Sequence, residues 1–316
     1  MHCRSIFVLF AALGTLCAEM SVTYEFSGGR FGDNLVTYLH AKWLSLKYGL
    51  PLLYKSFDYS SELVLHDRER GFETRHQFYR QVKLNNRQRL PSDFSHGPSW
   101  ILVCPYFAED PSDRWLNPNG YRFDVDWKDP EFRRVAREMV APKGELNLQP
   151  VDPARVNVAI HVREGGGFDT DHTRLWDPLK LPPFHFYLEA FQKVLADFDG
   201  CPLYFHIFTD ALDPSQLAAQ FEQAVPEGAD VRIGYRRENN HYSANVLDDF
   251  FSLFEFDALI HPQSNFSIVP SLINDYAIVY SPYNFVRQDG TITVTEIAVK
   301  SDETLREIVF KRIGRL

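Results

Sequence analysis

The sequence contains little of what marks several large classes of protein. Only four of its 316 residues are cysteine, and two of them, Cys3 and Cys17, lie at the amino end. The remaining Cys104 and Cys201 allow at most one disulfide, and no C-x-x-C or H-E-x-x-H spacing indicates a metal site. The chain has no basic run and a net charge of −9. This acidic balance argues against nucleic acid or an anionic membrane surface as a partner.

Long apolar runs are also missing, apart from one near the start, and no later segment is suited to span a bilayer. Residues 1–18 combine a basic Arg4, an apolar run over 5–16 and small residues at Cys17 and Ala18, which predicts a secretory signal peptide. The alternative is a buried first strand. The leader predicts a protein of the ER or Golgi lumen or an exported one, and a cytoplasmic protein if residues 1–18 are not a signal peptide.

The chain does have 45% hydrophobic residues and a regular alternation of short apolar segments with amphipathic ones. Segments rich in β-branched and aromatic residues predict strands, and segments with a period near 3.6 predict helices. The chain opens with a predicted strand, helix and strand at 21–26, 35–48 and 50–54. After a linker over 146–155 the alternation restarts, with predicted strands at 156–162, 202–209, 231–235, 258–262 and 276–282, and predicted helices at 182–198, 213–225, 244–256, 265–275 and 301–314.

This alternation predicts an α/β fold with two facing Rossmann-type domains and a cleft between them. We expect an amino-terminal domain at 19–150, a carboxy-terminal domain at 151–285, and a tail with a terminal helix at 286–316. Ligands of parallel α/β sheets bind beyond the carboxyl ends of the strands. That rule selects four loops that follow predicted strands, SGGRFGDN (27–34), HVREGGGFDTDH (161–172), TDALD (209–213) and HPQSNFS (261–267).

The second of these loops carries His161 and Arg163, whose side chains point the same way off the end of a strand, followed by three glycines. An arginine beside glycines can hold a phosphate through two hydrogen bonds while the backbone approaches it. The alternative is an arginine paired with an acid such as Asp169. Asp210, at the end of the next strand, is a candidate to hold a ribose, a base or His161.

The last and first of the four loops are less specific indications of a ligand site. Ser264, Asn265 and Ser267 begin a predicted helix, where hydroxyl and backbone N–H groups can form an anion site, although serine is also a common N-cap. The first loop, FSGGRFGDN, has neither the G-x-G-x-x-G spacing nor the Lys-Ser/Thr of a P-loop. Its three glycines either let a ligand touch the backbone or only form a turn between strand and helix.

In this order, the segments resemble the fucosyltransferase superfamily, which includes α1,2- and α1,6-fucosyltransferases and protein O-fucosyltransferases and has the two-domain GT-B architecture. GGRFGDNLVTYLHAKWLSLKYGLPL is similar to the family's opening G-x-[LF]-G-N-Q loop and helix, and VAIHVREGG to its H-x-R-R-x-D motif. LPPFHFYLEAFQKV, HIFTDALDPSQL and DDFFSLFEFDALIHPQSNFSIVPSLI resemble its D-Y-Y-x-x-A helix, its F-S/T-D-D strand end and its closing N-S-[ST]-F-S segment. The resemblance spans residues 22–285 with gaps over 55–155.

The resemblance implies a metal-independent, inverting glycosyltransferase that moves fucose from GDP-fucose to a glycan or protein hydroxyl, with no cofactor beyond that donor. It implies that Arg163 binds the β-phosphate, within a donor site of His161, Arg163, Asp210, Ser264, Asn265, Phe266 and Ser267. It places the sugar and acceptor against the amino-terminal domain, at Gly29, Arg30, Gly32, Asp33 and Asn34. We therefore expect the glycines to let that backbone approach the sugar and acceptor, as a wall of the cleft.

Two departures from the family pattern bear on the chemistry. The second arginine of H-x-R-R is Glu164 here, and the N-Q pair is Asp33-Asn34. An acceptor hydroxyl needs a base within hydrogen-bond reach, and Asp33 is the first candidate and Glu164 the second. The alternative for Asp33 is a helix N-cap. These departures leave open a different nucleotide sugar as donor, or a secreted carbohydrate-binding protein without catalysis.

Overall fold

The computed structural model describes residues 20–84, 100–106, 125–165 and 177–315, and the structural statements below concern these residues. The strands are β1 (Met20–Tyr24), β2 (Leu53–Tyr54), β3 (Arg70–Gly71), β4 (Arg80–Lys83), β5 (Trp100–Cys104), β6 (Val156–Val162), β7 (Leu203–Thr209), β8 (Val231–Tyr235), β9 (Ala258–Ile260), β10 (Ile278–Gln288) and β11 (Thr291–Ser301). The helices are α1 (Phe31–Tyr48), α2 (Leu65–Arg68), α3 (Pro130–Val140), α5 (Phe184–Asp197), α6 (Ser215–Gln223), α7 (Val246–Ser252), α8 (Asn265–Ile273) and α9 (Glu303–Arg312).

The amino-terminal half contains a parallel sheet in the order β1-β5-β4, with β2 and β3 paired beside it. Helix α1 packs under this sheet because its apolar residues recur at a helical period, and Leu35 and Leu39 are fully buried. Gly49 ends the helix in the left-handed conformation, with φ of 63°. A side chain there would be strained, so the glycine sets the helix end.

The carboxy-terminal half is built on a six-stranded sheet in the order β11-β10-β9-β6-β7-β8. Its strands are parallel except for the β10–β11 hairpin. All seven residues of the central strand β6 are buried, as expected of a parallel strand covered on both faces. Helices α5 and α6 supply one covering layer, and Leu253, Phe256 and Tyr276 pack in a separate cluster with Ala159 of β6.

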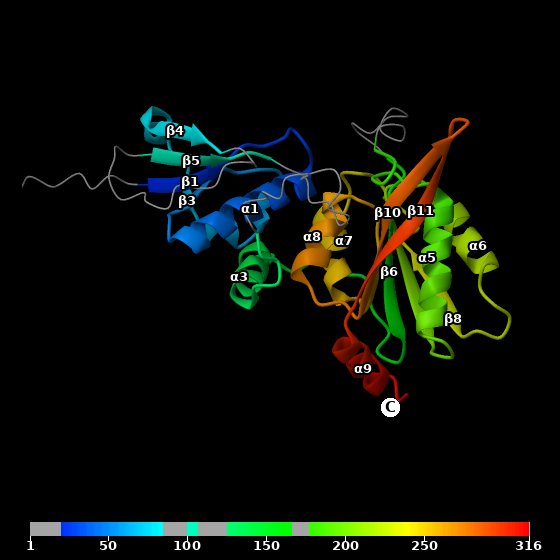
Figure 1. Ribbon diagram of the computed structural model, residues 1–316. Coiled ribbons are helices and arrows are strands. Elements are labelled where there is room, and N and C mark those ends of the chain that lie inside the picture. The colour runs from blue at the N-terminus through cyan, green and yellow to red at the C-terminus, as the bar shows by residue number, and fades with distance from the viewer. Residues whose placement is uncertain (1–19, 85–99, 107–124, 166–176, 316) are drawn as a thin grey trace, which may run out of the picture.

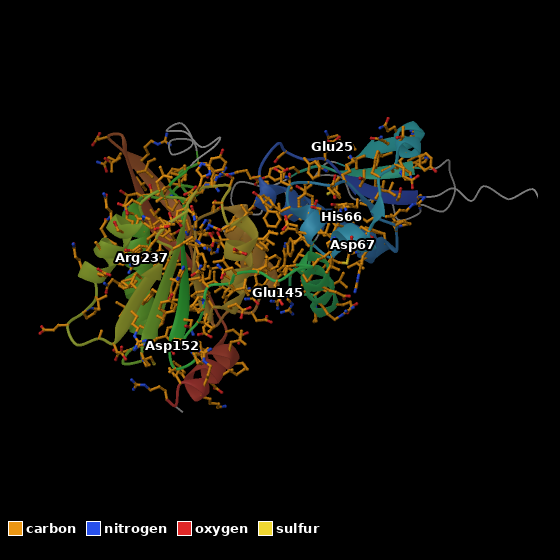
Figure 2. The ribbon with its side chains drawn as sticks, turned by 180° about the vertical axis from the view of Figure 1, so that it is seen from behind. Glu25, His66, Asp67, Glu145, Asp152 and Arg237 are labelled. Atoms are coloured by element: carbon orange, nitrogen blue, oxygen red, sulfur yellow. The ribbon has the colours of Figure 1, made fainter. Side chains whose placement is uncertain are left out.

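Helices α7 and α8 join the two halves. They lie between the sheets in Figure 1, although both belong to the carboxy-terminal part of the sequence. Their apolar side chains are buried in the same cluster as α1 and β1, which includes Val246, Leu247, Phe250, Phe251, Val269 and Ile273. The chain also crosses between the halves along the segment from α3 to β6, which contains Glu145 and Asp152, labelled in Figure 2.

The mixed α/β fold with parallel sheets is the predicted one, but several boundaries differ. The boundary expected at 285 falls inside β10, and the expected tail at 286–316 contains β11, which completes the sheet, as well as α9. Helix α1 begins four residues before the predicted 35. The predicted signal peptide lies outside the described residues, and none of the described helices is long and apolar enough to cross a membrane.

Candidate functional site

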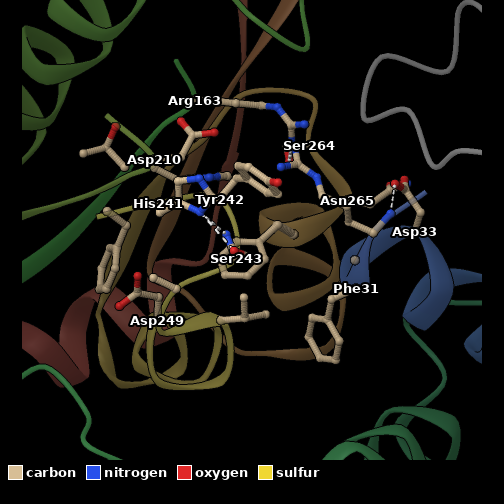
Figure 3. Close-up of a pocket in the computed structure, with 18 of the residues that line it drawn as sticks. Phe31, Asp33, Arg163, Asp210, His241, Tyr242, Ser243, Asp249, Ser264 and Asn265 are labelled. Atoms are coloured by element: carbon tan, nitrogen blue, oxygen red, sulfur yellow. Dashed lines mark hydrogen bonds between the residues drawn. The ribbon is translucent and has the colours of Figure 1, made fainter. Parts of the chain in front are cut away.

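A cavity of about 450 Å³ lies between the two halves, at the carboxyl ends of β6, β7 and β8 (Figure 3). Both halves contribute to its wall. The amino-terminal half supplies residues 30–33 and 58–59, and the carboxy-terminal half supplies residues 161, 163, 180, 208–210, 241–244, 246, 249 and 264–266. This is the place that the topology of parallel sheets predicts for a ligand.

Arg163 follows β6 and reaches the first turn of α8. Its Nη1 donates a hydrogen bond of 2.9 Å to Ser264 Oγ. Ser264 occupies the N-cap position of α8, but its side chain does not bond to the helix backbone. The alternative that the Ser264 side chain only caps the helix is therefore wrong, because its hydroxyl accepts a hydrogen bond from the guanidinium instead. A guanidinium and the positive end of a helix thus meet at one wall of the cavity, an arrangement that favours an anion.

His161 supports this wall from behind. Its Nδ1 lies 2.7 Å from Ser267 Oγ, and that hydroxyl donates to the Ser264 carbonyl oxygen at 3.2 Å. Burial, and next the neighbouring charge of Arg163, hold the pKa of His161 well below its usual value. The imidazole is therefore neutral, and the net positive charge at this wall comes from arginine.

Asp210 organises the loop that carries Arg163. Its Oδ1 accepts hydrogen bonds from the backbone N–H groups of Glu164 at 2.7 Å and Gly165 at 3.3 Å. Asp210 lines the cavity, so the expected contact with a ribose or base stays a prediction, whereas His161 bonds to Ser267 rather than to Asp210. Glu164 does not line the cavity. Asp169, the expected alternative partner of Arg163, lies outside the described residues.

One glycine of the opening loop, Gly32, allows close packing between two helices. A Cβ on Gly32 would lie 2.5 Å from the backbone nitrogen of Phe266, so the glycine lets α1 touch the start of α8. A Cβ on Gly29 would lie 2.2 Å from Asp33 Oδ2. Gly32 and Arg30 line the cavity, whereas Gly29 and the buried Asn34 do not. Gly32 thus lies both in the cavity wall and at the contact with α8, and the approach of this backbone to a sugar stays a prediction.

Asp33 connects the two halves through its carboxylate. Its Oδ1 accepts a hydrogen bond from Asn265 Nδ2 at 2.7 Å (Figure 3). It also accepts one from the Tyr106 hydroxyl at 3.1 Å. Its Oδ2 accepts the backbone N–H of Arg30, the true N-cap residue of α1, at 3.2 Å. The N-cap alternative for Asp33 is therefore wrong in position, because Asp33 is the third helical residue. Burial and the Asp33 charge raise the pKa of Tyr106, which stays protonated as a donor.

These contacts also bear on the N-x-S/T sequon at 265–267, the one such sequence in the chain. Asn265 is only 9% exposed, and its amide nitrogen bonds to Asp33 and to Tyr106. Glycosylation attaches a bulky sugar to this nitrogen at the surface. The folded protein therefore offers no accessible acceptor at this sequon.

Sequence reasoning missed one wall of the cavity, the loop after β8. Tyr242 in this loop lies under the guanidinium of Arg30, with 5.2 Å from Cζ to the ring centroid, and its ring is 4.1 Å from that of His241. Asp249, in α7, accepts a hydrogen bond of 2.6 Å from Arg236 Nη2. Burial raises the pKa of Asp249, and Arg236 opposes this. The signal was present, because the loop follows a predicted strand at 231–235.

The second missed group is the turn after β2, which brings Asp58 and Tyr59 to the cavity. It lies in the stretch over 55–100 where no element was predicted. The hydroxyl of Tyr59 donates to the Ser243 carbonyl oxygen at 3.2 Å, so the turn reaches across to the loop after β8. No sequence pattern marked this turn, because its approach to the cavity depends on contacts between the two halves.

No protein-family model matches the sequence, and neither does any curated protein. Among solved structures, fucosyltransferase NodZ from Bradyrhizobium matches with a TM-score of 0.51 and 12% identity, over 90% of this chain and 99% of that chain. The chain shares its overall fold with this fucosyltransferase. FUT1 of Arabidopsis thaliana matches with a TM-score of 0.48 and 12% identity, over 88% of this chain and 73% of that chain. At such identities, the likeness concerns the fold, and the chemistry must be argued from the site.

Proposed function

We propose that the chain is a glycosyltransferase of the GT-B arrangement, which transfers fucose from GDP-fucose to a hydroxyl group of a glycan or glycoprotein. The observation that carries this proposal is the bond from Arg163 to Ser264 at the start of α8, inside a cavity lined by both halves. The fold shared with a fucosyltransferase supports it. A different nucleotide sugar is the alternative donor.

In this reaction the acceptor oxygen attacks C1 of the sugar from the face opposite to the diphosphate, and the bond from C1 to the diphosphate oxygen breaks with inversion. Negative charge gathers on the departing GDP. Arg163 and the amino end of α8 stabilise that charge, and the loss of one such donor costs a factor of about a hundred or more in rate. Arg30, on the opposite wall, provides a second cation toward the sugar.

The proposal includes no metal, no cofactor beyond the GDP-sugar, and a place in the secretory pathway or outside the cell. The sequence contains Asp-x-Asp triplets at 124–126, 169–171 and 197–199. This spacing can bridge a metal ion to a diphosphate, so the proposal of a metal-independent reaction rests on the resemblance alone. In the described part of the chain, no three His, Cys, Asp or Glu side chains gather to hold a metal ion. Titration of GDP with EDTA and with Mg²⁺ tests this: equal affinity supports the proposal.

The decisive experiment is calorimetric titration of the protein from Glu19 onward with GDP, UDP and ADP. We expect GDP to bind more tightly than UDP and ADP, and Arg163→Ala to lose most of that affinity. Arg232→Ala is the matched control, because this arginine is exposed on β8 and pairs with Asp152 away from the cavity. A folded protein that binds none of the three nucleotides contradicts the proposal.

A carbohydrate-binding protein without catalysis is the second candidate. It is favoured because neither expected base is placed to take a proton from an acceptor. Asp33 accepts three hydrogen bonds within the protein, and Glu164 does not line the cavity. Release of GDP from GDP-fucose distinguishes the two. A protein that binds GDP but never releases it from the sugar nucleotide fits this second candidate.

A further inference from the structure

Among the residues that the structure describes, four carboxylates line the cavity, and three of them accept hydrogen bonds from other groups of the protein. Asp33 holds Tyr106, Asn265 and the first turn of α1. Asp210 holds two backbone N–H groups, and Asp249 is paired with an arginine. A carboxylate whose oxygens already accept hydrogen bonds within the protein has fewer free lone pairs with which to receive an acceptor hydroxyl.

Asp58 is the fourth carboxylate, and it differs from the others. It is exposed at the cavity wall, and it has no hydrogen bond or ion pair with any residue in the described parts of the chain. It also comes from the amino-terminal half, whereas Arg163 and Ser264 belong to the carboxy-terminal half. In a displacement with inversion, the acceptor and its base stand on the side of C1 away from the leaving diphosphate. The wall that carries Arg163 and Ser264 therefore suits the diphosphate, and the wall that carries Asp58 suits the base.

The turn that carries Asp58 is rigid at its base. The hydroxyl of Ser60 accepts the backbone N–H of Phe57 at 2.8 Å and the hydroxyl of Tyr54 at 2.6 Å. A functional carboxylate needs such support, because a loosely held group loses the geometry of the reaction.

Tyr59, at the tip of the same turn, has a backbone conformation that is energetically unfavourable. Tyr59 has a φ of 65°, which is rare for a residue with a side chain, and it is held by its bond to Ser243 and by the ring of Phe31, 6.0 Å away. Such strained residues cluster at functional sites. The bond across the cavity holds Tyr59 and so constrains the backbone of the neighbouring Asp58.

We propose that Asp58, rather than Asp33 or Glu164, is the catalytic base that takes the proton of the acceptor hydroxyl. The inference rests on the proposed function and names the residue that completes it. The acceptor oxygen forms its bond to C1, the bond from C1 to the diphosphate breaks, the electron pair leaves with GDP, and the acceptor proton passes to the carboxylate of Asp58. Because Asp58 is exposed, it returns that proton to solvent.

The test uses GDP-fucose alone, with water and then azide as the acceptor. Water must lose a proton when it attacks C1, whereas azide is already an anion and gives fucosyl azide and GDP without a base. For Asp58→Ala we expect GDP release to water to fall by about a hundredfold or more, and sodium azide to restore it. The affinity for GDP should stay within about threefold of wild type, because the base does not hold the leaving group.

Glu62→Gln is the matched control, since it removes a second negative charge near Tyr59 without touching the cavity wall. Three results would each overturn the assignment of Asp58 as the base and leave the proposed function standing. They are undiminished GDP release by Asp58→Ala, a loss of GDP release in Asp58→Ala that azide does not restore, and an equal loss of GDP release in Glu62→Gln. A wild-type protein that does not bind GDP, or binds it without ever releasing it from GDP-fucose, overturns the proposed function and this inference with it.

Discussion

Asp33 shows how one side chain can hold two halves of a protein together. Its carboxylate accepts donors from α1, from the segment after β5 and from α8, which are far apart in sequence. The same carboxylate was expected to remove a proton from the acceptor. The observed hydrogen bonds give it a structural task that does not require catalysis.

Replacement of Asp33 by asparagine separates the two roles. We expect the free energy of unfolding to fall by about 1–3 kcal/mol, because Tyr106 and Asn265 lose a charged acceptor. Denaturation in guanidinium chloride measures this change, and GDP release from GDP-fucose measures turnover. A structural residue gives turnover in proportion to the folded fraction. A loss of about a hundredfold in a fully folded variant would instead restore Asp33 as the base.

Three buried histidines predict the acid sensitivity of the fold. Burial lowers the pKa of His206 to about 3 and that of His261 to about 4, and it lowers the pKa of His161 as well. Since the unfolded chain has the ordinary value of 6.5, it binds more protons than the folded chain below that pH. The stabilising contribution is therefore complete above pH 6.5 and is lost as the pH falls.

Each of these groups makes the free energy of unfolding fall by up to about 1.4 kcal/mol per pH unit below 6.5. The measurement is chemical denaturation at pH 7, 6, 5 and 4. His206→Gln should reduce the slope by about one proton, since it removes one titrating group. An unchanged slope in this variant would show that His206 is not buried as a neutral imidazole.

At the scale of elements, the close approach of α1 to α8 depends on a position without a side chain. Gly32, in the first turn of α1, meets the backbone at the start of α8. The contact places Arg30 and Phe31 on one side of the cavity and Ser264 on the other. The geometry of the site thus follows from how closely two helices pack.

Gly32→Ala should push these helices apart. The added methyl group would meet backbone atoms that cannot rotate away, so we expect a loss of about 1–3 kcal/mol in stability and weaker GDP binding. Gly71→Ala is the control, because that position has open space and no left-handed backbone. Wild-type stability and GDP affinity in Gly32→Ala would show that α1 and α8 can separate without harm.

At the scale of the whole molecule, the boundary expected at residue 150 does not separate two independent cores. Side chains of α7 and α8, from residues 246–273, complete the apolar cluster of the amino-terminal half. Arg133 of α3 also donates to the Asn274 carbonyl oxygen and pairs with Asp275, beyond the end of α8. The amino-terminal sheet therefore depends on the rest of the chain.

A fragment of residues 19–150 should not fold by itself. Without α7 and α8, the face of α1 that carries Phe31 and Leu35 would be exposed to water, at a cost of about 25 cal/mol for each Å² of apolar surface. Circular dichroism and binding of a hydrophobic dye test this, with the full chain as the control. A cooperative thermal transition in the fragment would contradict the shared core.

The sequence alone determined the order of strands and helices, because hydrophobic period and turn residues act within short segments. It also determined the strand-end loops that carry Arg163, Asp210 and Ser264. Only the tertiary structure decided which partners these side chains have: Ser264 serves Arg163 rather than its own helix, Gly32 serves the contact with α8, and Asp58 reaches the cavity from a segment without a pattern. These facts depend on contacts between residues as many as 234 positions apart, such as Gly32 and Phe266, and local periodicity carries no information about them.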